Sequence, residues 1–130
     1  MTAMMQTDEV WLVCGGRDFN DADLMDEAMY QLATVRGFPR IIIHGGARGA
    51  DTLAGKLAVD LEVDVKVYPA DWEKHGKAAG AIRNSKMLTV GQPDVVVAFP
   101  GGNGTADMVA KAKRAMVDTY VVPARTKQNA

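Results

Sequence analysis

Three glycine-rich stretches each follow an apolar run and then return to polar residues: "CGGRDF" from Cys14, "HGGARGAD" from His44 and "PGGNGTAD" from Pro100. Glycine lets a ligand approach the backbone closely and permits positive φ angles. The free N–H groups at a helix start favour anions such as phosphate. Each stretch taken alone also fits a tight turn. Together they predict a phosphate-binding rim formed by Gly15, Gly16, Gly45, Gly46, Gly101, Gly102, Gly104 and Thr105.

Cationic and aromatic side chains accompany these glycines. Arg17 and Arg48 lie inside two of the stretches, and arginine suits bidentate binding of phosphate, although either side chain could instead pair with a neighbouring aspartate. In "AIRNSKM", we expect Arg83 to bind a phosphate and Asn84 a sugar or base; a solvated helix face is the alternative. Trp72, in "YPADWEKH", offers an indole that could stack on a base or pack beneath its loop.

The remaining reactive side chains predict no metal centre. Two histidines and one cysteine are too few for a metal-ligand cluster, so we expect no metal and no cofactor. Cys14 ends a buried run, and core packing is its expected role. His75 is expected to be structural or solvated. A single cysteine cannot form an internal disulfide, which indicates a reducing, cytoplasmic setting.

Short apolar runs and helical patterns alternate along the chain. The predicted strands are residues 10–14, 40–43, 65–68, 94–99 and 119–122. Most are continuous Val, Ile and Leu blocks, which is typical of parallel strands buried on both faces. The predicted helices lie at residues 24–32, 53–61, 76–89 and 109–116. This alternation predicts an α/β domain with a parallel sheet, and right-handed crossovers bring every strand-to-helix turn to one edge of it.

Length and composition indicate one ordinary globular domain. The chain has 130 residues, 48% of them hydrophobic, with a formal net charge of -1. A near-neutral balance argues against a protein that coats nucleic acid, because phosphate neutralisation needs a basic surface. No apolar run approaches the roughly 18 residues of a membrane span. We expect a single domain over residues 1–130, with flexible ends at 1–9 and 124–130.

Known nucleotide fingerprints are absent from the glycine stretches. "GGNGT" lacks the lysine of a P-loop, and "GGARGA" aligns to GxGxxG only when its spacing is broken. A conventional dinucleotide or ATP-hydrolysing site is therefore not supported. Instead, "GGRDF", "HGGARGAD", "YPADW…GKAAGAIRNSKML" and "AFPGGNGTADM" resemble the YspA-type (DUF2493, cpYpsA-related) branch of the SLOG superfamily. Its relatives include LOG-type "lysine decarboxylase" fold proteins and the DNA-processing protein DprA.

The resemblance implies a Rossmann-like, three-layer fold. It also implies a five-stranded parallel sheet in the order 3-2-1-4-5, with helices on both faces and a site for nucleotides or nucleotide-derived ligands. LOG enzymes release the base from a nucleoside 5′-monophosphate and carry PGGxGTxxE with an upstream arginine. The glycines and Thr105 match that pattern here, but Met108 occupies the glutamate position. If the chain is an enzyme, Asp18, Asp51 or Asp71 is expected to supply the carboxylate, and N-capping is the alternative role for Asp18 and Asp51.

Three hypotheses for function follow. The leading one is the binding, for sensing or processing, of a phosphorylated nucleotide or nucleotide-derived ligand. The second is hydrolysis of an N-glycosidic bond in a nucleotide, with the catalytic residue unassigned. A weaker third is contact with single-stranded DNA, as in DprA, which the net charge of -1 makes unlikely. We also expect a homodimer, in which the apolar face of "ADMVAKAKRAM" could meet a partner.

Overall fold

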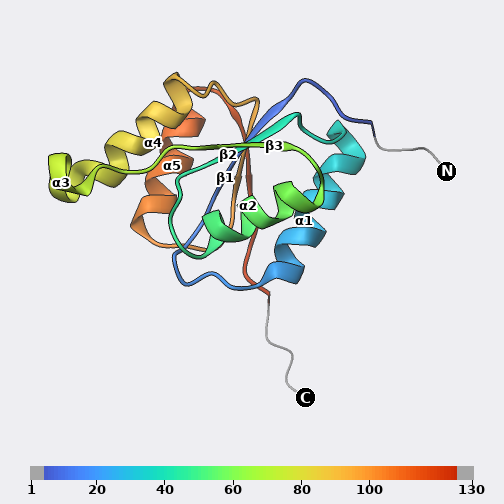
Figure 1. Ribbon diagram of the computed structural model, residues 1–130, viewed down its shortest axis with the longest axis horizontal. Helices are drawn as coiled ribbons and strands as arrows, with labels where there is room; N and C mark the ends of the chain where they lie inside the picture. The colour runs from blue at the N-terminus through green and yellow to red at the C-terminus, as the bar shows by residue number, and fades with distance from the viewer. Residues whose placement is uncertain (1–4, 126–130) are drawn as a thin grey trace, which may run out of the picture.

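The computed structural model describes residues 5–125 and shows one parallel sheet between two layers of helices (Figure 1). The strands are β1 (Val10–Cys14), β2 (Ile41–His44), β3 (Asp64–Val67), β4 (Val95–Ala98) and β5 (Asp118–Val121). The helices are α1 (Ala22–Arg36), α2 (Ala50–Asp60), α3 (Trp72–His75), α4 (Ala79–Thr89) and α5 (Asn103–Arg114), with a short 3₁₀ turn, η1 (Gly76–Ala78).

The sheet has the order β3-β2-β1-β4-β5, and all four strand pairs are parallel. This confirms the predicted α/β, Rossmann-like architecture. The apolar strands β1 and β4 occupy the centre and are buried along their whole length. The edge strands contain more polar residues, and all four residues of β3 are exposed. The observed β1 has the predicted bounds, and each of the other strands begins and ends one residue from its predicted bounds, because backbone pairing rather than hydropathy sets a strand's limits.

Side chains of the central strands alternate between two hydrophobic cores, one on each face of the sheet. Trp11, Val13 and Ile42 pack with α1 and α2. Leu12, Val96 and Ala98 pack on the opposite face, with residues of α4 and α5 that include Met108 and Ala112. Figure 1 shows α4 and α5 together on one side of the sheet and α1 on the other. Each central strand is therefore covered on both faces, as the continuous apolar runs predict.

The segment expected as one irregular helix over residues 76–89 is divided. Asp71 caps the short helix α3 by accepting a hydrogen bond from the Lys74 N–H at 3.1 Å. Gly76, with φ +55°, ends that helix, and η1 then leads into α4. In Figure 1, α3 projects beyond the body of the domain at the end of α4. The glycine break therefore holds the Trp72 segment apart from the regular helix.

The chain segment before β1 is held by hydrogen bonds. Phe38 N–H donates to the Met5 carbonyl at 2.9 Å, Thr7 N–H donates to the Phe38 carbonyl at 2.8 Å, and Gln6 forms a bridge with Phe38. The sequence predicts a flexible end over residues 1–9, and residues 5–7 of that segment have these hydrogen-bond partners. At the other end, Arg125 pairs with Asp21 and Glu27. Residues 1–4 and 126–130 lie outside the described range.

Candidate functional site

A cleft opens at the carboxyl ends of β1 and β4, where the order of the strands reverses. Chain connections leave these two neighbouring strands toward opposite faces of the sheet, and such a switch point is where open α/β sheets bind ligands. The cleft has a volume of about 520 Å³. Its lining residues come from the end of β1, from the turns after β1, β2 and β4, and from α2, α3, η1, α4 and α5: Cys14, Gly15, Gly16, Arg17, Ala47, Asp51, Trp72, Lys77, Gly80, Ala81, Arg83, Asn84, Met87, Gly102, Asn103, Gly104, Thr105 and Asp107.

Some glycines of the rim are needed to pack the turns against one another. A Cβ on Gly15 would lie 2.6 Å from the Cβ of Ala50, and one on Gly16 would lie 2.9 Å from the Pro100 carbonyl oxygen. The Gly16 N–H donates to that same carbonyl at 2.9 Å. A Cβ on Gly101 would in turn meet the Gly16 nitrogen at 2.6 Å. These glycines join the first and third stretches directly.

In the second stretch, one glycine adopts a positive φ angle and another makes room for an arginine side chain. Gly46 has φ +74°, and its N–H donates to His44 Nδ1 at 3.0 Å. A Cβ on Gly45 would collide with the guanidinium of Arg83, which donates to the Gly45 carbonyl at 2.7 Å. Gly45 is buried, and its backbone lies directly against the guanidinium of Arg83, so a side chain at position 45 would displace that guanidinium.

Gly102 and Gly104 face open space. A Cβ on either residue would have no heavy atom within 4 Å, and neither residue has a positive φ. Gly102 is the N-cap residue of α5, with no side-chain cap, and the first N–H groups of an α-helix have no acceptor within the helix. Packing therefore does not require glycine at either position, and the absence of a side chain leaves space beside the start of α5.

A polar network links α4 to the start of α5. Asn84 is buried; its Nδ2 donates to the Gly104 carbonyl at 3.1 Å and to Asp107 at 3.0 Å, while its Oδ1 accepts from Arg83 Nε at 3.1 Å. Asp107 also pairs with Lys111 at 3.0 Å. Asn84 thus has protein partners on both sides of its amide, and it holds Arg83 and the α5 turn in place around the cleft.

Two carboxyl groups line the cleft in contrasting surroundings. Burial raises the pKa of Asp51, although hydrogen bonding from the Ala47 N–H and the nearby charges of His44 and Arg83 oppose that shift. Burial also acts on Asp107, but hydrogen bonds from Lys111 and Asn84 outweigh it and lower the pKa of Asp107. The cleft therefore combines one carboxyl group with a raised pKa and one with a lowered pKa.

Cys14 and His44 lie beneath these groups and are unsuited to nucleophilic chemistry. Burial and the nearby Asp51 raise the pKa of the Cys14 thiol to about 12, so the thiol remains protonated at neutral pH. Burial lowers the pKa of His44, whose Nδ1 accepts the Gly46 N–H. Both side chains are buried. Cys14 and His44 therefore suit packing beneath the cleft as neutral, buried side chains.

The outer rim carries arginines and an exposed tryptophan. The Arg17 guanidinium lies 5.2 Å from the centroid of the Trp72 ring, and Trp72 is 49% exposed. These two residues also line a smaller hollow with Ala47 and Arg48, which extends the cleft outward. Arg48 pairs with Asp18 at 3.3 Å. Because both of those side chains are largely exposed, the pair contributes little to stability.

The predicted site residues are therefore divided between the cleft and its surroundings. Of the three aspartates considered for catalysis, Asp51 lines the cleft, whereas Asp18 lies on the outer rim and Asp71 caps α3. Met108 is fully buried in the core on the sheet side of α5. Sequence reasoning missed Lys77, Asn103 and Asp107 as lining residues. The signal for Asp107 was available, because Met108 and Ala112 share the apolar face of α5 and the preceding residue is rotated by about 100° from it.

Two features are absent from residues 5–125, the part of the chain that the structure describes. No group of three or more His, Cys, Asp or Glu side chains there is arranged to hold a metal ion. None of the helices in that range has both the length and the apolar character that crossing a membrane requires.

Comparisons with known proteins agree with the fold. The model of the YspA, cpYpsA-related SLOG family matches residues 10–75, which include the first two glycine stretches. The Gene 61 protein of Mycobacterium phage D29 is 35% identical over 111 residues, covering 80% of this chain and 88% of that protein. The pantoate-beta-alanine ligase of Francisella tularensis, solved with beta-gamma ATP and beta-alanine, has a TM-score of 0.50 at 10% identity, covering 98% of this chain and 69% of the ligase. At that identity the likeness to the ligase shows the fold alone.

Proposed function

Because this chain belongs to the YspA, cpYpsA-related SLOG family, we propose that its cleft binds a phosphorylated nucleotide or a nucleotide-derived ligand. The observation that carries the proposal is the open space at Gly102 and Gly104, beside the uncapped start of α5. Phosphate oxygens placed there would accept hydrogen bonds from N–H groups that have no acceptor within the helix. Binding within the cytoplasm is part of the same proposal and fits the neutral, buried Cys14 thiol.

Cationic side chains complete the proposed phosphate site. Arg83 is half-buried at the inner wall, and its guanidinium is fixed by the Gly45 carbonyl and by Asn84. A guanidinium held in this way loses little freedom when it binds an anion. Arg17 and Lys77 line the cleft nearer to solvent. The base of the ligand would then extend toward Trp72, whose exposed indole offers a stacking surface.

Substitutions at Gly102 test the proposal. Gly102→Asp places a carboxylate in the space assigned to phosphate, and we expect it to weaken nucleotide binding by about 100-fold or more. Gly102→Asn has nearly the same shape without the charge and should lose much less affinity. Isothermal titration calorimetry with nucleoside mono-, di- and triphosphates and ADP-ribose measures both variants. Equal affinities for the Asp and Asn variants would refute a phosphate at the start of α5.

A second candidate function, hydrolysis of an N-glycosidic bond, is favoured by the two cleft carboxyl groups. Opposite pKa shifts on two acids of one cleft are a common arrangement for an acid and a stabilising carboxylate. The protonated form of Asp51 would donate its proton to the leaving base, and ionised Asp107 would stabilise the positive sugar. Water would then add to the sugar carbon and return a proton to Asp51, which releases ribose 5-phosphate. Mass spectrometry of small molecules after incubation with nucleoside monophosphates would detect free base and ribose 5-phosphate. Turnover that is unchanged in both Asp51→Asn and Asp107→Asn would rule out these assignments.

A further inference from the structure

The outer edge of β3 has hydrogen-bonding groups that no described residue uses. Within residues 5–125, β3 pairs with β2 alone and is the last strand of the sheet on that side. Asp64 N–H donates to the Arg40 carbonyl, and Tyr68 N–H donates to the His44 carbonyl. Since successive residues of a strand turn their backbone groups to opposite sides, Val65 and Val67 present theirs away from the sheet. An edge of this kind is a template for pairing with another strand.

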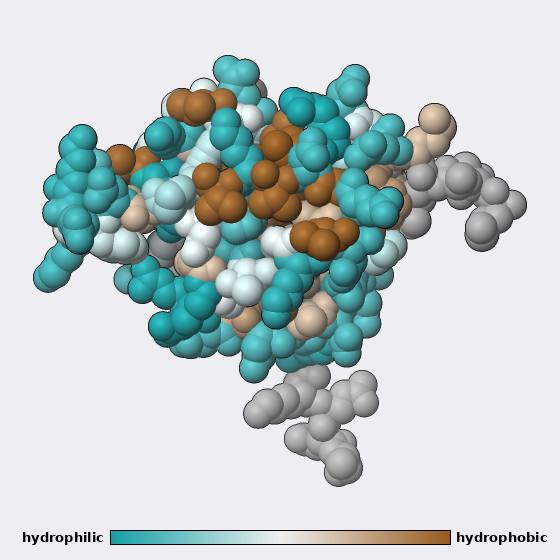
Figure 2. Space-filling model, viewed as in Figure 1, coloured by the Kyte–Doolittle hydropathy of each residue, from teal (hydrophilic) through white to brown (hydrophobic). Residues whose placement is uncertain are grey.

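Side chains along this edge are apolar on one face and charged on the other. Val65 and Val67 share the face of Ile42 and α2, and they are 37% and 45% exposed. Asp64 and Lys66 lie on the opposite face, because side chains alternate along a strand. β3 crosses the front of the molecule in Figure 1, and Figure 2 shows apolar groups gathered over the middle of that same view. The edge therefore combines an unpaired backbone with exposed valines.

The sequence of β3 pairs opposite charges in a single antiparallel register. When two copies are related by a twofold axis at Val65, Asp64 of each copy lies opposite Lys66 of the other. Registers centred on Asp64 or Lys66 instead place two like charges directly opposite one another, which is unfavourable. The register at Val65 also makes Val65 the reciprocal hydrogen-bonded pair, because its backbone groups point outward. Val67 also turns its backbone groups outward, but a register centred on it places Lys66 opposite Tyr68 and forms no ion pair. Charge pairing therefore favours the register at Val65.

We propose that two copies of this chain associate through β3, forming one continuous ten-stranded sheet with antiparallel pairing centred on Val65. A twofold axis perpendicular to the sheet keeps both α2 helices on the same face. Each α2 packs against β2 and, on either side of it, against β1 and β3. With strands spaced by about 4.8 Å, two helices centred over β2 lie about three spacings apart, farther than the roughly 8–10 Å at which helices pack. The helices therefore do not clash, and the valines of both copies lie between them on the sheet.

Pairing occurs between one short strand of each copy, so we expect a weak dimer that depends on protein concentration. Neither glycine turns nor cleft residues take part, and the dimer can therefore be tested without a nucleotide. The expected interface also differs from the α5 surface considered from the sequence. Most residues of α5 that face the sheet are already buried within the domain, such as Met108 and Ala112.

Charge reversals provide the test, measured by sedimentation velocity over a range of protein concentrations. Asp64→Lys alone and Lys66→Asp alone place like charges opposite one another twice per dimer, and each should raise the dissociation constant by about tenfold. The double variant D64K/K66D restores opposite charges. An equimolar mixture of the two single variants does so as well, because positions 64 and 66 are then both lysine in one chain and both aspartate in the chain that faces it. Both should recover wild-type association.

Matched control variants show whether a loss of association comes from charge pairing on β3 or from the change in net charge alone. Asp23→Lys on α1 and Lys86→Asp on α4 change the net charge by the same amounts at exposed positions away from β3, and they should leave association unchanged. Circular dichroism melting curves verify that every variant is folded. A wild-type protein that stays monomeric throughout would overturn the proposal. So would a dimer that ignores the single reversals, or single variants that weaken association without recovery in the mixture.

Discussion

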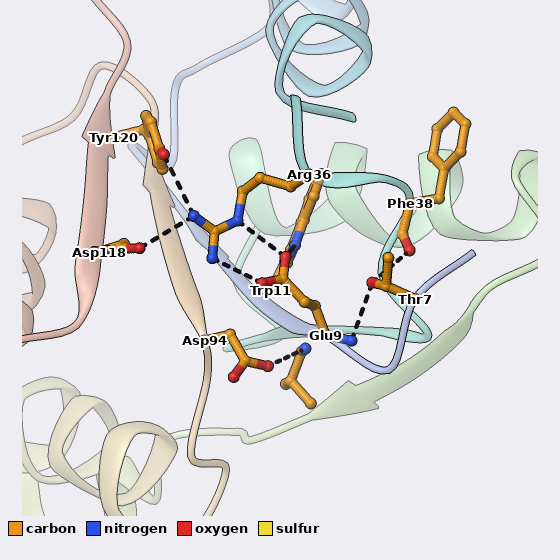
Figure 3. A network of polar contacts seen from close by, with 9 residues as sticks. Thr7, Glu9, Trp11, Arg36, Phe38, Asp94, Asp118 and Tyr120 are labelled. Atoms are coloured by element: carbon orange, nitrogen blue, oxygen red, sulfur yellow. Dashed lines mark hydrogen bonds and ion pairs between the residues drawn. The ribbon is translucent and has the colours of Figure 1, made fainter. Parts of the chain in front are cut away.

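The two ends of the same sheet are built in opposite ways. At the amino ends of the strands, Arg36 donates to Glu9 at 2.7 and 2.9 Å and to Asp118 at 3.0 Å, and Glu9 also accepts from Trp11 Nε1 (Figure 3). At the carboxyl ends, Asp51 and Arg83 line an open cleft and form no ion pair with each other within 4 Å.

The two ends of the sheet differ in whether their charged side chains pair with one another. Arg36 extends from the end of α1 between Glu9 before β1 and Asp118 on β5, so side chains from three elements neutralise one another (Figure 3). The Asp94 carboxylate likewise accepts the Val10 N–H at 2.7 Å. The cleft instead keeps Asp51 and Arg83 without an ion pair between them, and under the proposed function a ligand would engage such groups. We therefore expect substitutions at the amino end to change stability alone and substitutions at the carboxyl end to change binding.

Arg36→Met should have the largest effect on stability. It removes charge-assisted hydrogen bonds to two carboxylates and leaves Glu9, which is only 25% exposed, without its cation. We expect a loss of about 2 kcal/mol in the free energy of unfolding, since partial exposure limits the effect. Urea denaturation measures this loss. Nucleotide affinity should not change, and a fall in affinity would show that the two ends of the sheet are coupled.

Glu9→Gln should produce a smaller loss that depends on pH. The hydrogen bond from Arg36 is the main reason why the pKa of Glu9 lies below its ordinary value of 4.5. The ionised carboxylate therefore contributes stability above that pH, and the contribution is lost as the pH falls through the lowered folded-state pKa. We expect the variant to be destabilised by about 1 kcal/mol at neutral pH. Denaturation curves for the variant and the wild type should converge in acid, and a constant difference would contradict this account.

Asp51→Asn should change stability in the opposite direction. Burial raises the pKa of Asp51 above its ordinary value of 3.8. The stability linked to its protonated form is present below 3.8 and is lost as the pH rises through the raised folded-state pKa. An uncharged asparagine can still accept the Ala47 N–H and avoids that loss. Denaturation at neutral pH should show a more stable variant, with no difference from the wild type in strong acid, whereas a destabilised variant would indicate that the charge itself holds the turn.

The gathering of the glycine turns on one edge could be predicted from the sequence, because continuous apolar strands and right-handed crossovers leave few alternatives. The strand order followed from the resemblance to SLOG proteins. Sequence reasoning could not divide the glycines into those that pack turns, such as Gly15 and Gly16, and those that leave space, such as Gly102. That distinction depends on which atoms approach each backbone position. The role of Asn84 was also beyond reach, because its partners on α5 lie 20 and 23 residues away in the chain.

The two tryptophans allow the smallest predicted effect to be measured. Trp11 is 1% exposed at the amino end of the sheet, whereas Trp72 is 49% exposed at the cleft. We expect Trp72→Ala to weaken nucleotide binding by about fivefold through lost stacking and to leave stability unchanged. Trp72→Phe retains an aromatic ring and should keep most of the affinity.

Fluorescence distinguishes this role from packing. The chain contains only two tryptophans, so nucleotide binding should quench the emission of Trp72 in the wild type. The Trp72→Phe variant emits from Trp11 alone and should show no quenching while still binding nucleotide by calorimetry. Quenching that persists in this variant would mean that the ligand is sensed at the buried amino-end tryptophan, and the separation between a stabilising end and a binding end would then fail.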